Sequence, residues 1–190
     1  MRGKRLRLTL KLYTIITCTG RTKYLRDHKV FGAIGENSTV MNRIVPLYPR
    51  LIRIGNNVHL ASKVTFVTHD VSHSMLNADP TLNGEVFEEK IGCIEIKDNV
   101  FVGAGTTILY GVQIGSNVII GAGTLVNKDI PPNSVVAGVP ARVIGTFDDY
   151  IERRRKEGSY PPEFAPSKEA ISEEAVEWCW KEFYKTHSEE

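Results

Sequence analysis

The sequence of 190 residues lacks most features of a disulfide-bonded, membrane-spanning or nucleic-acid-binding protein. Its three cysteines, Cys18, Cys93 and Cys179, are odd in number and scattered, which indicates a reducing compartment rather than a disulfide framework. The formal net charge of +2 gives no nucleic-acid signature over the whole chain. We therefore expect a cytoplasmic protein without a nucleic-acid partner.

The first 30 residues also lack an apolar run long enough to span a membrane. The run from Leu8 to Cys18 is interrupted by Lys11, and it is well short of the about twenty residues that cross a bilayer. The same region carries nine Lys and Arg residues against a single acid, Asp27. We predict that residues 1–30 form a basic, amphipathic or strand-like lead-in, and weak association with an anionic membrane surface is the less favoured alternative.

What the sequence does contain is an internal repeat. Val102–Thr106 returns eighteen residues later as Ile120–Thr124, and an aliphatic residue occupies every sixth position from Ile96 to Val126. Six residues at about 3.3 Å each make one flat face, and three faces make a triangular coil that stacks on the next at about 4.8 Å. One aliphatic side chain per face then points to the axis. The spacing predicts a β-solenoid, and it is too regular for the alternative, a β-sandwich.

Counting coils locates one interruption in this solenoid. Ile54–Val58 matches the segments that begin at Ile96 and Ile114, but Ile54 and Ile96 are forty-two residues apart, and one coil accounts for eighteen. Twenty-four residues must therefore leave the solenoid. The segment at about 70–92 has no six-residue phase and is rich in Asn, Asp and Gly, so we predict an extruded loop there. Long loops in compact proteins usually carry function.

Beyond Gly145 the composition changes. Asp148 precedes a short charged segment that is typical of a capped helix, and a second helix from about Ser172 places apolar residues along one stripe. We expect this stripe to pack on the solenoid or on a neighbouring subunit. The expected organisation is a lead-in at 1–30, a solenoid domain at 31–145 and a helical extension at 146–190.

A histidine lies where the predicted loop leaves the solenoid. His69 and Asp70 directly follow a stretch that keeps the six-residue phase, so the scaffold would hold the imidazole while leaving it open to a ligand. Imidazole accepts a proton around neutral pH, as a general base must. The alternative is a loop histidine that only caps a turn through Asp70, and the spacing alone leaves both interpretations open.

The stretch from Ile54 through Ile144 resembles the hexapeptide-repeat acyltransferases, in particular the branch that includes galactoside and maltose acetyltransferases and polysaccharide-modifying relatives. This stretch is about half of the chain, and the segments that carry the resemblance are Ile54–Val58, Val64–His69, Ile120–Asn133 and the closing stretch Ala137–Gly145. The resemblance implies an all-β fold: a left-handed parallel β-helix of hexapeptide repeats with a long extruded loop and a C-terminal helical extension.

The resemblance also implies a reaction, the acetyl-CoA-dependent O-acetylation of a saccharide hydroxyl. In this family the histidine at the position of His69 takes the proton from the acceptor hydroxyl, which attacks the thioester carbonyl directly. Asp70 is the second candidate catalytic residue, and it would orient His69 or a substrate hydroxyl. Other small hydroxyl or amine acceptors, such as an antibiotic or serine, stay open.

The same resemblance implies that acetyl-CoA lies in a groove between adjacent subunits of a homotrimer. The positions that match the family's CoA contacts are Ala104, Ala122, Asn127, Lys128 and Arg142. Lys128 and Arg142 suit the pyrophosphate or the ribose phosphate of CoA. Ala104 stands where galactoside acetyltransferase has a serine. Gly145 stands where that enzyme has a further arginine, and the loss of this arginine predicts weaker phosphate binding.

Two other functional classes use the same solenoid. A γ-class carbonic anhydrase needs three histidines on zinc, and the spacing of His59, His69 and His73 does not fit, so we expect no metal site. The other class is a non-catalytic solenoid. The presence of His69 together with the Asn127–Lys128 corner argues against it.

Overall fold

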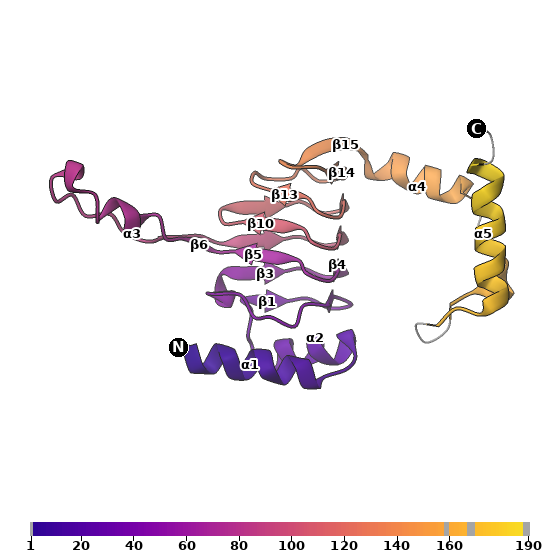
Figure 1. Ribbon diagram of the computed structural model, residues 1–190, viewed down its shortest axis with the longest axis horizontal. Coiled ribbons are helices and arrows are strands. Elements are labelled where there is room, and N and C mark those ends of the chain that lie inside the picture. Colours follow the sequence, from indigo (N-terminus) through magenta and orange to yellow (C-terminus); the bar gives the residue numbers. More distant parts are fainter. Residues whose placement is uncertain (1, 158–159, 167–169, 188–190) are drawn as a thin grey trace. The chain divides into compact units, whose positions relative to one another are not determined.

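The structure is a computed structural model that describes residues 2–157, 160–166 and 170–187. Contacts within the chain divide it into two units, residues 1–151 and residues 152–190, which we describe separately. Short parallel strands stacked in coils make up most of the larger unit (Figure 1). This arrangement is the β-solenoid that the six-residue spacing predicts.

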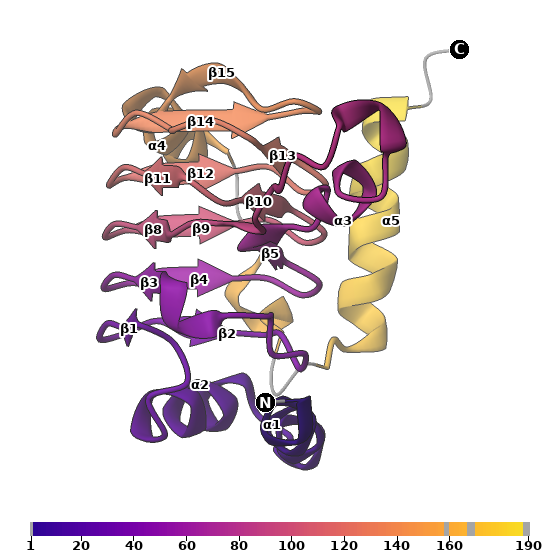
Figure 2. The same cartoon turned by 90° about the vertical axis from the view of Figure 1, so that its left-hand side faces the viewer.

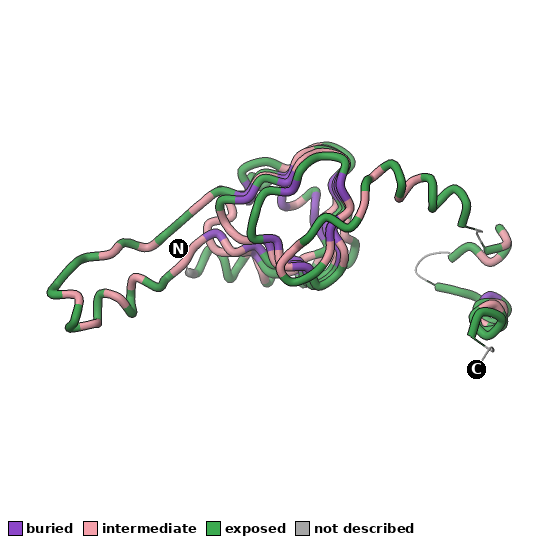
Figure 3. The backbone as a smooth tube through the Cα atoms, turned by 90° about the horizontal axis from the view of Figure 1, so that it is seen from above, coloured by how far each residue is buried: buried purple, intermediate pink, exposed green. Residues whose placement is uncertain are grey.

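Three parallel sheets form the walls of the solenoid, and its coils superpose when viewed along the stack (Figure 3). The first wall contains β1 (Ala33–Ile34), β3 (Ile52–Ile54), β8 (Ile94–Ile96) and β11 (Val112–Ile114). The second contains β2 (Thr39–Val40), β4 (Val58–Leu60), β9 (Val100–Val102), β12 (Val118–Ile120) and β14 (Ser134–Ala137), with the antiparallel β15 (Arg142–Thr146) at its end. The third contains β5 (Thr65–Val67), β10 (Thr107–Leu109) and β13 (Leu125–Val126).

The register of the strands follows the eighteen-residue period. Val118 pairs with Val100, whereas Ile96 pairs with Ile54, forty-two residues earlier, because the inserted segment lies inside that coil. The aliphatic residues at every sixth position from Ile96 to Val126 are at most 1% exposed. Burial contributes roughly 1.5–3 kcal/mol for each such side chain, so the stacked columns are the main source of stability.

One corner of the coils is an asparagine ladder that the sequence analysis did not identify. Asn57, Asn99, Asn117 and Asn133 have left-handed φ angles of 52°, 58°, 58° and 57°. Each side-chain amide donates to the next side-chain carbonyl along the stack, at 2.9, 3.0 and 2.9 Å. Asparagine tolerates the left-handed region better than most residues, so this corner combines a turn preference with a hydrogen-bonded column.

Two helices cover one end of the solenoid, α1 (Arg2–Thr14) and α2 (Cys18–Asp27) (Figure 2). Thr17 caps α2 by accepting a hydrogen bond from the Gly20 amide at 3.1 Å. Leu12 and Leu25 are 1% exposed and extend the solenoid core. The strand-like alternative for residues 1–30 is therefore wrong, and the fold class is not all-β: helices precede and follow the parallel β-solenoid along the chain.

The inserted segment leaves the third wall after β5 and returns before β8 (Figure 1). At its base, β6 (His69–Asp70) pairs antiparallel with β7 (Lys90–Ile91). The amide of Gly92 donates to the carbonyl of Thr68 at 3.0 Å and closes the base. Further out are a helical turn, α3 (His73–Leu76), and a 3-10 turn at Pro80–Leu82.

The C-terminal residues form α4 (Phe147–Lys156) and, in the smaller unit, α5 (Glu173–His187). Thr146 begins α4 with a reciprocal cap, because its hydroxyl donates to the Asp149 carboxylate at 2.7 Å and accepts from the Asp149 amide at 3.1 Å. Ser172 caps α5 through the Ala175 amide at 3.2 Å. On α5 the ring of Trp180 packs edge-on against Phe183. In the described parts of both units, no helix combines the length and the apolar character needed to cross a bilayer.

Candidate active site

His69 lies at the junction of the rigid wall and the inserted segment. The residue before it, Thr68, is fully buried, and its hydroxyl donates to the Leu47 carbonyl at 2.6 Å. The backbone of His69 pairs with Ile91, and the ring of Tyr48 packs edge-on against the imidazole with centroids 5.7 Å apart. Three segments distant in sequence therefore fix the position of this imidazole.

The two ring nitrogens of His69 are left for other partners. Nδ1 is buried and has no hydrogen-bond partner among the described residues, and Nε2 has no hydrogen bond to them either. An unpaired buried polar atom costs roughly 1–3 kcal/mol, and native proteins keep few of them without a reason. Nε2 of this positioned imidazole is thus free for a ligand or for proton transfer, whereas Nδ1 is buried and unpaired among the described residues.

Asp70 has a different set of partners. Its carboxylate accepts from the Ser72 amide at 2.7 Å and from the Tyr110 hydroxyl at 3.4 Å. The hydrogen bonds from Ser72 are the main reason that the pKa of Asp70 lies below its ordinary value, and the charge of Lys90 adds to this effect. Among the described contacts there is no hydrogen bond from Asp70 to His69, so the carboxylate shapes the turn that leaves β6.

Sequence reasoning missed Tyr48, which belongs to the same site. Its hydroxyl donates to both carboxylate oxygens of Glu89, at 3.3 and 3.2 Å, and so connects the start of β3 to the end of the inserted segment. Burial, followed by the negative charge of Glu89, raises the pKa of the Tyr48 hydroxyl. Tyr48 has a left-handed φ of 50°, an uncommon conformation for an aromatic residue. In the sequence, the only local feature that distinguishes Tyr48 is the pair of prolines around it, in Pro46-Leu47-Tyr48-Pro49.

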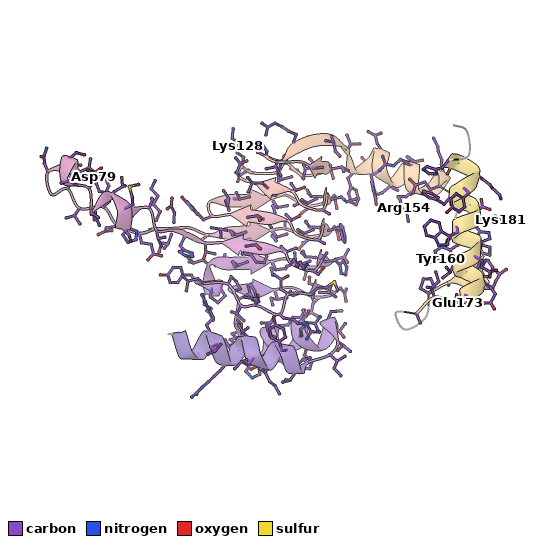
Figure 4. The ribbon with its side chains drawn as sticks, in the orientation of Figure 1. Asp79, Lys128, Arg154, Tyr160, Glu173 and Lys181 are labelled. Carbon is purple, nitrogen blue, oxygen red and sulfur yellow. The ribbon has the colours of Figure 1, made fainter. Side chains whose placement is uncertain are left out.

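Three of the five predicted cofactor residues come together at the last coil. They are Asn127, Lys128 and Arg142, and they line a pocket of about 340 Å³ together with Asp129, Ile130, Pro131, Ala141 and Val143. The amide of Ala141 donates to the Leu125 carbonyl at 2.8 Å, which holds the turn that carries Arg142 against β13. The Lys128 side chain projects from the solenoid near β15 (Figure 4). None of these lining residues belongs to the His69 site.

The other two predicted cofactor residues, Ala104 and Ala122, lie at exposed turns of successive coils and not in this pocket. The carbonyl of Ala104 accepts a hydrogen bond from the Gly123 amide at 2.8 Å. A Cβ on Gly103 would lie 2.5 Å from the backbone nitrogen of Ala122, so glycine is needed for this close stacking. The two alanines therefore present mainly backbone to an approaching molecule.

The remaining histidines of the solenoid and loop do not join His69. His59 has its two ring nitrogens in contact with Thr39 Oγ1 at 2.9 Å and with Asn57 Oδ1 at 3.1 Å. His73 lies in α3, and its buried Nδ1 has no partner within the described ranges. The described residues contain no group of three or more His, Cys, Asp or Glu side chains that could hold a metal ion.

Short stacked strands that repeat every six residues, interrupted by a loop with a histidine at its base, define a hexapeptide-repeat solenoid. Residues 94–128 match the family model "Bacterial transferase hexapeptide (six repeats)". The chain is 46% identical over 118 residues to the galactoside O-acetyltransferase of Escherichia coli (strain K12). The aligned region covers 61% of this chain and 54% of that protein.

Two solved structures extend the similarity over more of the chain. A maltose O-acetyltransferase from Clostridium difficile 630 is 30% identical with a TM-score of 0.55, covering 76% of this chain and 85% of that one. A galactoside acetyltransferase in complex with coenzyme A is 31% identical with a TM-score of 0.51, covering 87% and 90% of the two chains.

The protein therefore belongs to the hexapeptide-repeat acetyltransferase family, and it is similar to the galactoside and maltose O-acetyltransferases within it. Its solenoid is of the left-handed β-helix family. The chain spans between 45% and 65% of the length of three curated relatives that it matches.

Proposed function

We propose that the protein is an acetyl-CoA-dependent O-acetyltransferase that transfers the acetyl group directly to a saccharide hydroxyl, with His69 as the general base. The observation that carries this proposal is the His69 imidazole itself, which the solenoid wall and Tyr48 position while both ring nitrogens lack partners among the described residues. The sugar acceptor is supported by the galactoside and maltose O-acetyltransferases among the relatives.

In this reaction His69 handles a single proton. The acceptor hydroxyl donates to Nε2, and the imidazole takes the proton as the oxygen–carbon bond to the acetyl carbonyl forms. The carbon–sulfur bond breaks, and the imidazolium returns the proton to the leaving thiolate, so that the ester and free CoA are the products. A base in this position contributes about 10²- to 10⁴-fold in rate.

The pocket at the last coil is the proposed site for the phosphates of CoA. Lys128 and Arg142 supply two exposed cationic side chains there, and Asn127 adds an amide that can donate to a phosphate oxygen. The exposed turns of Ala104 and Ala122 offer backbone contacts to the pantetheine part of the donor. In a homotrimer this groove would be shared with the adjacent subunit, which is part of the proposal.

Asp70 and Glu89 are the proposed polar contacts for the acceptor. The Asp70 carboxylate is ionised at neutral pH and can accept a hydrogen bond from a sugar hydroxyl near His69. Glu89 is held beside the His69 site by the Tyr48 hydroxyl. Carboxylates that accept hydrogen bonds are suited to hydroxyl-rich ligands.

A thiol-release assay tests this proposal. The full chain is given acetyl-CoA with galactosides, maltose, serine and a hydroxyl-bearing antibiotic, and free CoA is measured. We expect turnover with a saccharide, and we expect His69→Ala to lower it by about 10²- to 10⁴-fold while the melting temperature stays the same. Faster turnover with serine or the antibiotic would assign a different acceptor class. Absence of CoA binding in a calorimetric titration would favour the non-catalytic solenoid.

A further inference from the structure

The outward face of α1 carries an apolar stripe that stays in solvent. Leu6, Leu10 and Tyr13 are 59%, 58% and 56% exposed, and just beyond the helix Ile16 is 86% exposed. The spacing of i, i+4 and i+7 places Leu6, Leu10 and Tyr13 on one side of the helix. A large apolar surface of this kind normally marks an interaction site.

The opposite face of α1 fixes the direction of this stripe. Leu12 is 1% exposed, and Leu8 and Ile15 pack against the same core, so the helix cannot rotate without exposing them. Arg43 holds the end of the helix, because its guanidinium donates to the carbonyl of Tyr13 at 3.2 Å and lies 5.7 Å from the centre of the Tyr13 ring. Since α1 lies at one end of the solenoid (Figures 1 and 2), the stripe faces away from the solenoid core.

The other exposed side chains of α1 include four cations. Lys4, Arg5, Arg7 and Lys11 are exposed on α1, which contains no acidic residue. None of the four forms an ion pair with another described residue. The one acid among the first 29 residues, Asp27, is already paired with Lys23 at 2.7 Å. The charge of α1 is therefore positive and uncompensated by the described residues.

We propose that α1 docks the protein on an anionic membrane surface. The helix would lie in the interfacial plane, with Leu6, Leu10 and Tyr13 in the headgroup region. Arg5 and Arg7, at the two sides of the stripe, would reach anionic headgroups, and the other cations of α1 would add to the attraction. Its 13 residues make a helix of about 20 Å, which suits a position on the bilayer surface rather than across it.

The charge distribution selects this occupant over two others. A second copy of α1 would bring two sets of uncompensated cations together, and neither copy offers an acid to pair with them. A nucleic acid would use the cations but would leave Leu6 and Leu10 in water. An anionic bilayer can pair with the cations and also bury the apolar stripe. Association with an anionic membrane surface, the less favoured alternative in the sequence analysis, therefore becomes the favoured one.

Flotation of the full chain with lipid vesicles tests the proposal. We expect binding to phosphatidylcholine vesicles that contain phosphatidylglycerol, little binding to phosphatidylcholine alone, and weaker binding at 1 M salt, where the Debye length falls to about 3 Å. The double substitution Leu6→Ser with Leu10→Ser should lower the bound fraction at least about tenfold. Both side chains are exposed, so circular dichroism should stay unchanged.

A matched pair of charge reversals controls for net charge. The double substitution Arg7→Glu with Lys11→Glu should abolish vesicle binding. The control, Lys156→Glu with Lys181→Glu, changes the net charge by the same amount at exposed positions outside α1, and it should leave vesicle binding intact. Equal losses in the two variants, or no binding by the unmodified chain, would overturn the proposal. It would equally fail if the Leu6 and Leu10 substitutions changed the oligomeric mass in sedimentation without changing vesicle binding. The test measures no turnover, so its outcome is separate from that of the proposed acetyl transfer.

Discussion

The ring of Tyr48 packs edge-on against the imidazole of His69, with centroids 5.7 Å apart and ring planes at 84°. The tyrosine is itself held by Glu89, which accepts from its hydroxyl at 3.2 Å. Since Glu89 lies at the end of the inserted segment and Tyr48 just before β3, this contact couples the imidazole to both the scaffold and the loop.

The first prediction concerns His69 as the proposed general base. Replacing His69 with Ala should lower kcat by about 10²- to 10⁴-fold, because the acceptor hydroxyl then has no proton acceptor. The matched control is His73→Ala, four residues along the chain and in α3, which should retain most turnover. Steady-state kinetics of both variants would check this, and a larger loss in His73→Ala would transfer the role of base to His73.

Tyr48 should act as a positioning residue. We expect Tyr48→Ala to lower kcat more than Tyr48→Phe, because phenylalanine keeps the ring contact with His69 and loses only the hydrogen bond to Glu89. A loss of roughly tenfold for alanine would correspond to about 1.4 kcal/mol in the barrier. The pH profile of kcat should shift only in the alanine variant, and equal kcat values for the two variants would contradict a role through the ring.

The charge of the Glu89 carboxylate should have a measurable effect on the pKa of the Tyr48 hydroxyl. The charge of Glu89 raises the pKa of the Tyr48 hydroxyl, so Glu89→Gln should move that pKa downward, toward the ordinary value of 10.0. Ultraviolet absorbance of tyrosinate during an alkaline titration measures this change, with Tyr48→Phe identifying the signal. Glu88→Gln is the matched control, because Glu88 is exposed and adjacent in sequence. An unchanged titration in Glu89→Gln would remove the carboxylate from the surroundings of Tyr48.

Because the pKa of Asp70 is lowered, the stability of the inserted segment where it leaves β6 should fall in acid. A carboxyl group whose pKa is lower in the folded state contributes stability above its ordinary value of 3.8, and this contribution is lost as the pH falls through the folded pKa. Asp70→Asn should therefore reduce the pH dependence of loop protection below about pH 4, measured by hydrogen exchange of the Ser72 amide. Asp148→Asn, at an exposed position of α4, should leave that pH dependence as it is.

Sequence periodicity predicted the solenoid because its inward columns repeat at a fixed spacing, and each of the aliphatic residues from Ile96 to Val126 occupies the expected inward position. It left an amphipathic and a strand-like form open for residues 1–30, and the structure has helices there, with Leu8, Leu12 and Ile15 at a helical spacing. The site was only partly predictable. His69 has a motif, but its contact with Tyr48 and that of Asp70 with Tyr110 connect residues 21 and 40 positions apart.

The last prediction concerns the pocket at the final coil. Arg142→Ala should raise the KM for acetyl-CoA roughly tenfold, about 1.4 kcal/mol, while kcat changes less, because a phosphate contact far from the reacting carbon contributes equally to substrate and transition-state binding. Arg53→Ala is the matched control, since Arg53 is also exposed but lies on β3, outside the pocket. The rise should shrink at high salt, because screening weakens the contact in the unmodified protein as well. If Arg142→Ala and Arg53→Ala had the same KM for acetyl-CoA, Arg142 would have no part in donor binding, and the pocket would lose one of its two cations as a phosphate site.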